Sequence, residues 1–216
     1  MTLAQTGDQI QVQGQKATLR ESLKAKRAQL KTEVPALNWG PAQLAKTLSF
    51  LTELNSKNAF FQKTIASYFP IQSELDLTGE STEKWLFPSA QKDGTLLWFE
   101  RGALGLENWV LTPFGTKERP LDQCHPLDNY DLPMIVLVPA LAVDLQGYRM
   151  GYGGGFYDRL LEQYSHKIIS VCCIYDDLIL DELLREKHDK PVDIIVSEKK
   201  ILEITNRNQL LCKLRT

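Results

Sequence analysis

The chain contains one stretch that an ordinary packed core does not explain, Arg149-Met150-Gly151-Tyr152-Gly153-Gly154-Gly155-Phe156-Tyr157-Asp158-Arg159. Glycine adds no side chain to a core and loses much backbone freedom on folding. Four glycines in five positions therefore indicate backbone that approaches a ligand closely or adopts positive φ. The two flanking arginines and the amide N–H groups of such a loop favour an anionic ligand. The stretch thus predicts a phosphate-binding loop.

The residues on either side of the glycines predict a strand, a loop and a helix. Phe156, Leu160, Leu161 and Tyr164 recur at helical spacing, so a helix should begin within or just after the glycines and turn its positive end toward them. Residues 134–138 form a continuous apolar run, as expected of a strand buried on both faces. The loop matches neither the dinucleotide fingerprint nor a P-loop. The alternative is a glycine-rich turn with locally packed tyrosines and no ligand.

The order of elements predicts an α/β fold. Strands are expected at residues 64–69, 85–88, 95–100, 134–138, 167–174 and 194–197. Helices are expected at 16–31, from near Pro41, after the glycine loop and at 177–187. Strands that alternate with helices favour a single-domain, three-layer α/β/α architecture around a mostly parallel, Rossmann-like sheet. Residues 1–15 are polar and are expected to form a flexible tail, with residues 16–216 as the single domain.

Composition narrows the class of protein. The 216 residues are 43% hydrophobic with a net charge of -2, so no overall field attracts nucleic acid. No apolar run approaches the ~20 residues of a membrane span, and the N-terminus does not resemble a signal peptide. The four cysteines form no C-x-x-C pair, and Cys124 beside His125 is not the spatial arrangement of a catalytic pair. We expect a cytoplasmic monomer that binds neither membranes nor nucleic acid.

Residues 16–31 predict an amphipathic helix with an unusual row of cations. Leucines form one narrow stripe, and five basic residues occupy the arc beside it. The leucines are Leu19, Leu23 and Leu30, and the basic residues are Lys16, Arg20, Lys24, Arg27 and Lys31. One interpretation is a solvated face whose cations extend over the edge of the core. The other is an anion-binding face.

The segment Val138-Pro139-Ala140-Leu141-Ala142-Val143-Asp144, followed by Gly147 and the glycine stretch, resembles the signature of the 5-formyltetrahydrofolate cyclo-ligase family. The resemblance extends from about Lys16 to Ser197. It implies a ligase of folate one-carbon metabolism that converts 5-formyltetrahydrofolate (folinic acid) to 5,10-methenyltetrahydrofolate. ATP would be the co-substrate and Mg²⁺ the cofactor, with release of ADP and phosphate.

The resemblance also implies roles for individual residues. ATP-binding residues would be Lys16, Arg20, Arg149, Gly151, Tyr152, Gly153, Gly154, Gly155, Phe156 and Tyr157. Folate-binding residues would be Phe69, Glu74, Tyr152, Gly153, Gly154, Gly155 and Phe156. Asp158 and Asp189 would hold the metal, and Arg149 and Asp158 would be catalytic. Without the resemblance, Glu74 is simply a solvated carboxylate at a strand end, Asp189 a residue that ends a helix, and Tyr157 a brace for the loop.

Two other functions stay open at this point. A sugar-phosphate isomerase or CoA transferase on a related scaffold would also place a glycine loop after a strand, but it needs an acid–base residue or a glutamyl nucleophile, and none stands out near the loop. A protein that binds folate or ATP without turnover is the second. The combination of Lys16 and Arg20 with Asp158 and Asp189 argues against it, because a binder of folate alone has no use for a magnesium triphosphate site.

Overall fold

The computed structural model describes residues 3–33, 64–78, 84–102 and 117–206, with short pieces at 42, 45–47, 49–50, 53, 110–111, 209–210 and 212. The helices are α1 (Leu3–Glu33), α3 (Phe156–Tyr164) and the 3-10 turns η2 (Leu121–Gln123), η3 (Leu127–Asn129) and η4 (Asp176–Leu178). The strands are β1 (Ile65–Ala66), β2 (Leu86–Ala90), β3 (Leu96–Glu100), β4 (Val110–Leu111), β5 (Lys117–Glu118), β6 (Met134–Leu137), β7 (Ala142–Asp144), β8 (Arg149–Met150), β9 (Ile168–Cys173), β10 (Ile179–Leu180), β11 (Ile194–Val196) and β12 (Ile201–Glu203).

A seven-stranded sheet forms the centre of the fold, in the order β12-β11-β9-β6-β1-β2-β3. The pairs from β11 to β2 are all parallel, and the two edge strands β12 and β3 are antiparallel to their neighbours. Every residue of β6 and of β9 is buried. Continuous apolar runs are what a parallel strand needs when both faces of its sheet are covered. The predicted mostly parallel α/β sheet is therefore confirmed.

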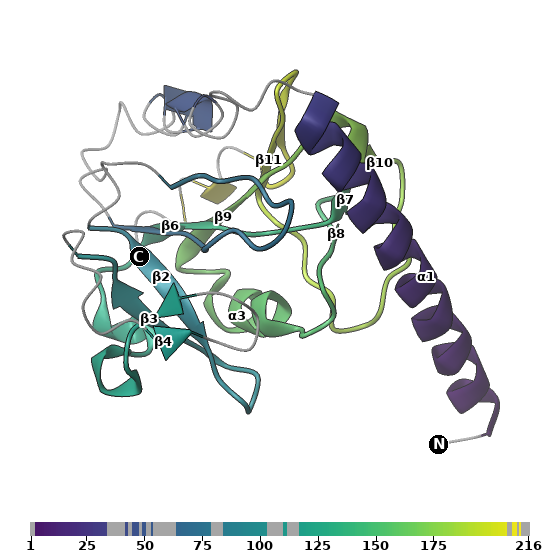
Figure 1. The fold of residues 1–216 in the computed structure, drawn as a ribbon, viewed down its shortest axis with the longest axis horizontal. Helices are drawn as coiled ribbons and strands as arrows, with labels where there is room; N and C mark the ends of the chain where they lie inside the picture. The colour runs from purple at the N-terminus through teal and green to yellow at the C-terminus, as the bar shows by residue number, and fades with distance from the viewer. Residues whose placement is uncertain are drawn as a thin grey trace.

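Helical segments lie on both sides of the central strands. Figure 1 shows α3 on one side of β6 and β9 and the helical residues 45–47 on the other. The Thr47 hydroxyl contacts the Cys173 thiol of β9 at 3.7 Å, so residues 45–47 pack directly on the sheet. Because β1 and β6 are parallel neighbours, their carboxyl ends lie at the same edge of the sheet. Open α/β sheets bind their ligands at this edge.

Helix α1 runs along one side of the molecule, and its N-terminal end projects beyond the body (Figure 1). It begins at Leu3, so helix continues through nearly all of residues 1–15, and the flexibility expected for that segment stays a prediction. Helix formers such as Gln and Ala explain the extension, and no proline interrupts it. Lys16, Leu23, Arg27 and Leu30 are buried, so two of the cations belong to the buried face.

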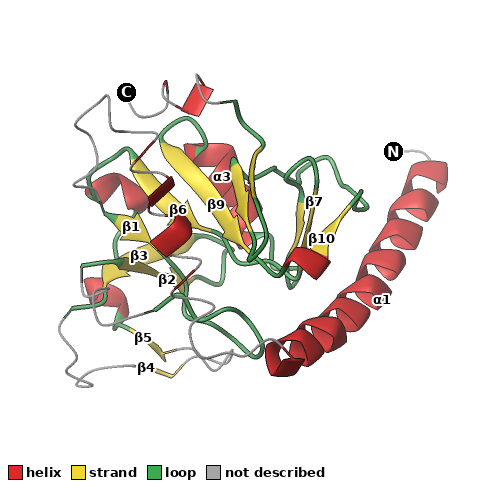
Figure 2. Ribbon diagram, turned by 90° about the horizontal axis from the view of Figure 1, so that it is seen from above, coloured by secondary structure: helices red, strands yellow, loops and turns green. Residues whose placement is uncertain are grey.

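The prediction of a helix at residues 177–187 was wrong. The chain there forms η4 and then β10, which pairs with β7 in a separate three-stranded sheet, β10-β7-β8. Figure 2 shows this small sheet between the main sheet and α1. The reason is the fully buried Asp144, whose carboxylate accepts hydrogen bonds from the Leu183 N–H at 3.2 Å and from Arg185 Nη2 at 2.8 Å. These bonds hold the segment in an irregular path that competes with helix.

None of the helices in the described ranges combines the length and apolar character that a bilayer crossing requires.

Candidate active site

The glycine loop connects β8 to α3. Gly153 has φ of 101° and Gly155 has φ of 66°, backbone conformations that residues with a Cβ rarely adopt. Gly155 is the N-cap of α3, which begins at Phe156 as predicted. Arg159 braces the loop from outside, because its Nη2 donates to the Gly154 carbonyl at 2.7 Å and its Nε to the Gly94 carbonyl at 2.8 Å. Arg159 thus ties the glycine loop to the turn between β2 and β3.

A cavity of about 340 Å³ opens beside this loop. Every residue for which the sequence predicted a ligand or metal contact lines it. These are Lys16, Arg20, Phe69, Glu74, Arg149, Gly151, Tyr152, Gly153, Gly154, Gly155, Phe156, Tyr157, Asp158 and Asp189. Residues from α1, from the segment after β1, from the glycine loop and from residues 186–189 thus meet at one place. The alternative of a glycine turn packed only on its own protein does not fit this geometry.

One part of the cavity wall is a network of direct ion pairs, here called the ion-pair end: Lys16, Arg149, Asp158, Glu186 and Asp189. The Lys16 ammonium is buried and lies 2.7 Å from Asp189 Oδ2 and 2.9 Å from Glu186 Oε2. The Glu186 N–H also donates to Asp189 Oδ2 at 2.7 Å. Glu186 was not predicted as a site residue, because it fell inside the wrongly predicted helix at 177–187.

Arg149 links Asp158 to the segment that carries Asp189, the second carboxylate that was expected to hold a metal. Its Nη2 lies 3.1 Å from Asp158 Oδ1, and its Nη1 donates to the Lys190 carbonyl at 2.7 Å. The Lys190 N–H returns a hydrogen bond to Asp158 Oδ1 at 3.1 Å. Asp158 is therefore fastened to the residue that follows Asp189, so both predicted ligands lie on neighbouring segments.

Among the described residues, one group of side chains has the composition and spacing of a metal site. It consists of Glu186, His188 and Asp189, whose ligand atoms lie within 4.8 Å of one another. Asp189 is common to this group and to the sequence prediction, whereas Asp158 is outside the group. The carboxylate oxygens are hard donors of the kind that Mg²⁺ prefers. The donor chemistry at the ion-pair end therefore fits that cation.

The opposite part of the wall, here called the Glu74 end, consists of Phe69, Glu74, Tyr152 and the Arg27 side chain behind them. Glu74 is buried, and its Oε2 accepts a hydrogen bond from the Ile71 N–H at 2.9 Å. Burial raises the pKa of Glu74 to about 7, against the Ile71 N–H and the Arg27 guanidinium, which both favour the ionised form. Phe69 stacks on Phe87 with ring centroids 4.2 Å apart. This end thus offers one carboxyl group among rings.

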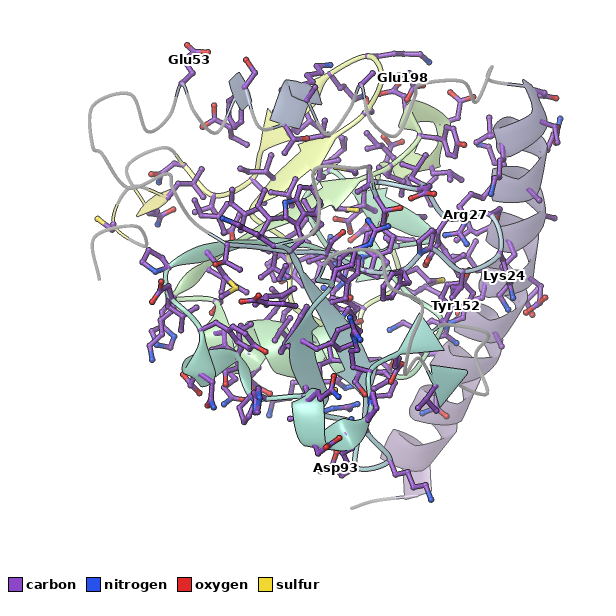
Figure 3. The ribbon with its side chains drawn as sticks, turned by 60° about the vertical axis from the view of Figure 1, so that its left-hand side comes forward. Lys24, Arg27, Glu53, Asp93, Tyr152 and Glu198 are labelled. Carbon is purple, nitrogen blue, oxygen red and sulfur yellow. The ribbon has the colours of Figure 1, made fainter. Side chains whose placement is uncertain are left out.

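Aromatic residues of the glycine loop complete the wall between the two ends. The Tyr152 hydroxyl accepts a hydrogen bond from Arg27 Nη2, and Figure 3 shows Arg27 and Lys24 on the inner side of α1 near Tyr152. The Tyr157 hydroxyl is buried without a hydrogen-bond partner among the described residues, and burial raises its pKa well above the ordinary value. Arg20 Nε donates to the Gly151 carbonyl at 3.1 Å, which ties α1 to the loop.

Glu118 is a further residue of the cavity that the sequence did not predict. It is buried, it lines the cavity, and its carboxylate accepts a hydrogen bond from the Ser89 hydroxyl at 2.6 Å. No local sequence pattern identifies it, because Glu118 lies on β5 and Ser89 on β2 of a different sheet, and only the tertiary fold brings them together beside the cavity.

The fold and the cavity define a class: an α/β protein that binds small molecules at the carboxyl edge of a mostly parallel sheet, with a glycine loop and buried charges in the binding site. Comparison with known proteins identifies the group within that class. The family model described as "5-formyltetrahydrofolate cyclo-ligase family" matches residues 12–198. The chain belongs to the 5-formyltetrahydrofolate cyclo-ligase family, whose members are enzymes that act on small-molecule substrates. The resemblance noted from the sequence is confirmed.

Individual relatives agree with the family match. A 5-formyltetrahydrofolate cyclo-ligase of Mycolicibacterium smegmatis is 33% identical over 64% of this chain and 75% of its own length. One of Haemophilus influenzae is 30% identical over 79% of this chain and 97% of its own length. The NMR structure of Aquifex aeolicus 5,10-methenyltetrahydrofolate synthetase has a TM-score of 0.63 at 26% identity. That match covers 88% of this chain and 93% of the synthetase.

Proposed function

We propose that this chain converts 5-formyltetrahydrofolate to 5,10-methenyltetrahydrofolate, with ATP as co-substrate and Mg²⁺ as cofactor, and releases ADP and phosphate. One observation carries the proposal: the ion-pair end, the glycine loop and the Glu74 end line a single cavity. The names of the relatives, which specify a cyclo-ligase and a methenyltetrahydrofolate synthetase, support the choice of substrate and product.

The reaction needs positioned ligands more than a protein nucleophile. The formyl oxygen of the substrate attacks the γ-phosphorus of ATP, and the bond to ADP breaks. The anilino nitrogen then attacks the activated formyl carbon, its proton is lost, and the carbon–oxygen bond breaks to release phosphate as the ring closes. Both steps depend on holding two ligands in line and on neutralising phosphate charge.

The ion-pair end, together with Arg20 and the glycine loop, would supply that neutralisation. Lys16, Arg20 and Arg149 are cations beside the cavity, and the glycine loop adds amide N–H groups at the N-terminus of α3. We assign phosphate binding to these three side chains and to Gly151–Gly155. Arg149 is buried, and its guanidinium contacts both the Lys190 carbonyl and the Asp158 carboxylate. The guanidinium is therefore already oriented before a ligand binds.

Asp158 and Asp189 would hold the magnesium ion, with Glu186 beside them. When bound, Mg²⁺ neutralises charge on the phosphate oxygens of ATP. The carboxylates of this chain would position the cation, and they are themselves kept in place by Lys16, Arg149 and the N–H groups of residues 186 and 190.

The Glu74 end would hold the pterin. A reduced pterin presents neighbouring N–H donors on its aminopyrimidine ring, and a carboxylate accepts two such hydrogen bonds side by side. Phe69, Tyr152 and Phe156 provide flat apolar surface for the rings of the substrate. A ligand placed in this way extends from Glu74 toward the glycine loop, where its formyl group would meet ATP.

The test mixes the purified protein with 5-formyltetrahydrofolate, Mg²⁺ and ATP and follows the absorbance of the methenyl product. We expect product only when ATP and Mg²⁺ are both present. Binding of folate without product under all conditions would contradict the proposal and favour a protein that binds without turnover. A monomeric state and a cytoplasmic location stay predictions from the sequence.

A further inference from the structure

The contacts of Arg27 in α1 are unusual for a charged residue. Its side chain is only 2% exposed, although arginine is almost never fully buried unless it is paired. Nε donates to the Ser73 hydroxyl at 3.0 Å, and Nη1 donates to the Ala140 carbonyl at 2.9 Å. Nη2 donates to the Tyr152 hydroxyl. One guanidinium therefore joins the segment after β1, the β6–β7 connection and the glycine loop.

Arg27 does not itself line the cavity, but two residues that it contacts, Glu74 and Tyr152, do. A residue buried for packing alone has no reason to carry a charge at this place, because burial of an arginine is costly unless its donors are satisfied. The rigid fork of the guanidinium suits it to fix several acceptors in one geometry. Its place behind the wall means that any effect on a ligand passes through these neighbours.

The contact with Glu74 differs from a closed ion pair. Arg27 Nη1 and Glu74 Oε1 are 3.9 Å apart, which is too long for a hydrogen bond. Glu74 Oε2 is bound by the Ile71 N–H, whereas Oε1 accepts no hydrogen bond from the described residues. A positive charge at this distance favours the carboxylate form and leaves Oε1 available to an incoming donor.

We propose that Arg27 is a positioning residue: it favours the carboxylate form of Glu74 in the cavity wall against the effect of burial and, with the same guanidinium, fixes Tyr152 and hence the glycine loop. This inference rests on the proposed function, because the ligand of Glu74 is taken to be the pterin of 5-formyltetrahydrofolate. It adds that the folate site and the loop beside the phosphates are set by one side chain.

The titratable groups around Glu74 make the inference testable by pH. Arg27 faces Glu74 from α1, Tyr68 from the segment after β1, Tyr152 from the glycine loop and Tyr157 from α3. Burial raises the pKa of all three tyrosines, so they stay neutral near pH 7. Glu74 and Arg27 then dominate the electrostatics of this end. Folate binding by the Glu74 carboxylate should be strong above the pKa of Glu74 and should weaken below it.

The experiment measures the dissociation constant of 5-formyltetrahydrofolate by calorimetry from pH 6 to 9, without ATP so that no turnover occurs. For the wild type we expect affinity to rise about tenfold from pH 6 to 8, with a midpoint near 7. In Arg27→Met the midpoint moves to higher pH, so affinity at pH 7 falls about tenfold and recovers in part at pH 9. Arg27→Lys keeps the positive charge but loses the planar guanidinium that donates to three acceptors at once. The midpoint then stays near that of the wild type, while kcat in the complete reaction falls because Tyr152 is released.

Matched variants separate these outcomes from loss of fold. Lys26→Met removes an exposed cation from the same turn of α1 and should bind folate as the wild type does. Glu74→Gln should bind 5-formyltetrahydrofolate weakly, with an affinity that does not change between pH 6 and 9. A merely structural role for Arg27 predicts weaker binding at every pH with an unchanged midpoint, and that result in Arg27→Met overturns the inference. If Arg27→Met does not fold by circular dichroism, an Arg27→Lys enzyme with wild-type kcat overturns it instead. A wild type that binds no folate refutes the proposed function itself.

Discussion

The two ends of the cavity use the same pair of charge types in opposite ways. At the ion-pair end, the Lys16 ammonium touches Asp189 at 2.7 Å and Glu186 at 2.9 Å. At the Glu74 end, Arg27 stays 3.9 Å from its carboxylate. Lys16 and Arg27 lie eleven residues apart on α1, three turns and about 16 Å along the same face. One face of α1 thus carries a cation in direct ion pairs at one end, and at the other end a cation that makes no hydrogen bond to Glu74 Oε1.

The difference between the two ends indicates different roles for their carboxylates. Closed pairs keep carboxylates in place until a stronger cation arrives, and they suit a site where the ligand brings its own metal and negative charge. A carboxylate held near a cation without a hydrogen bond is poised for a donor from the ligand. Asp158 and Glu74 are both acidic residues of one cavity, but they should differ strongly in what their removal does.

The largest effect is expected at the ion-pair end. Asp158→Asn keeps the shape of the side chain but removes the charge that Arg149 faces at 3.1 Å, so we expect kcat to fall by roughly 100- to 1000-fold with the fold retained. Steady-state kinetics and circular dichroism check this. Glu162→Gln is a matched control on α3, because Glu162 pairs with the side chain of Lys190 at the exposed surface. An Asp158→Asn enzyme with wild-type kcat would show that the ion-pair end is only structural.

A smaller effect, on stability, is expected at the Glu74 end. The pKa of Glu74 is about 7 in the folded chain and 4.5 ordinarily. Folding therefore favours the protonated form, and this contribution is fully present below about pH 4.5 and is lost as pH rises through 7. A neutral amide in place of the carboxyl group has no such loss. The free energy of unfolding of Glu74→Gln, relative to the wild type, should thus rise by about 2–3 kcal/mol between pH 5 and 8.

Urea unfolding at the two pH values measures that difference. Glu21→Gln, at an exposed position of α1, is the control and should show a difference from the wild type that does not vary with pH. A difference that is equally flat in Glu74→Gln would mean that Glu74 is ionised throughout this range. The rise in folate affinity expected between pH 6 and 8 would then lose its physical basis.

The same contrast explains what could be predicted from the sequence. The central strands were predictable because a strand buried on both faces needs a continuous apolar run, as at 134–138 and 167–174. The glycine loop was predictable because positive φ at Gly153 and Gly155 leaves few other residues possible. The family resemblance then supplied Lys16, Glu74 and Asp189, which no local pattern singles out.

The residues that were missed depend on long-range contacts. Arg27 belonged to the predicted row of cations, but its buried position follows from Ser73, Ala140 and Tyr152, which come from three distant segments. Glu186 was assigned to a helix that Asp144 prevents. Periodicity reports which face of an element is apolar, and it carries no information about a buried acceptor far away in the sequence.

The smallest effect concerns Lys16 and distinguishes the two ends most sharply. If the ammonium and a divalent cation compete for Asp189 and Glu186, Lys16→Met should bind Mn²⁺ without nucleotide about tenfold more tightly than the wild type, because two carboxylates lose their counter-ion. The same variant should bind ATP about tenfold more weakly, because a phosphate partner is lost. Electron paramagnetic resonance of Mn²⁺ and calorimetry of ATP give the two constants, with Lys31→Met on the exposed face as control. Opposite shifts are the mark of a cation that holds the place of the metal, whereas an equal loss of both ligands would mean that Lys16 only keeps this end folded.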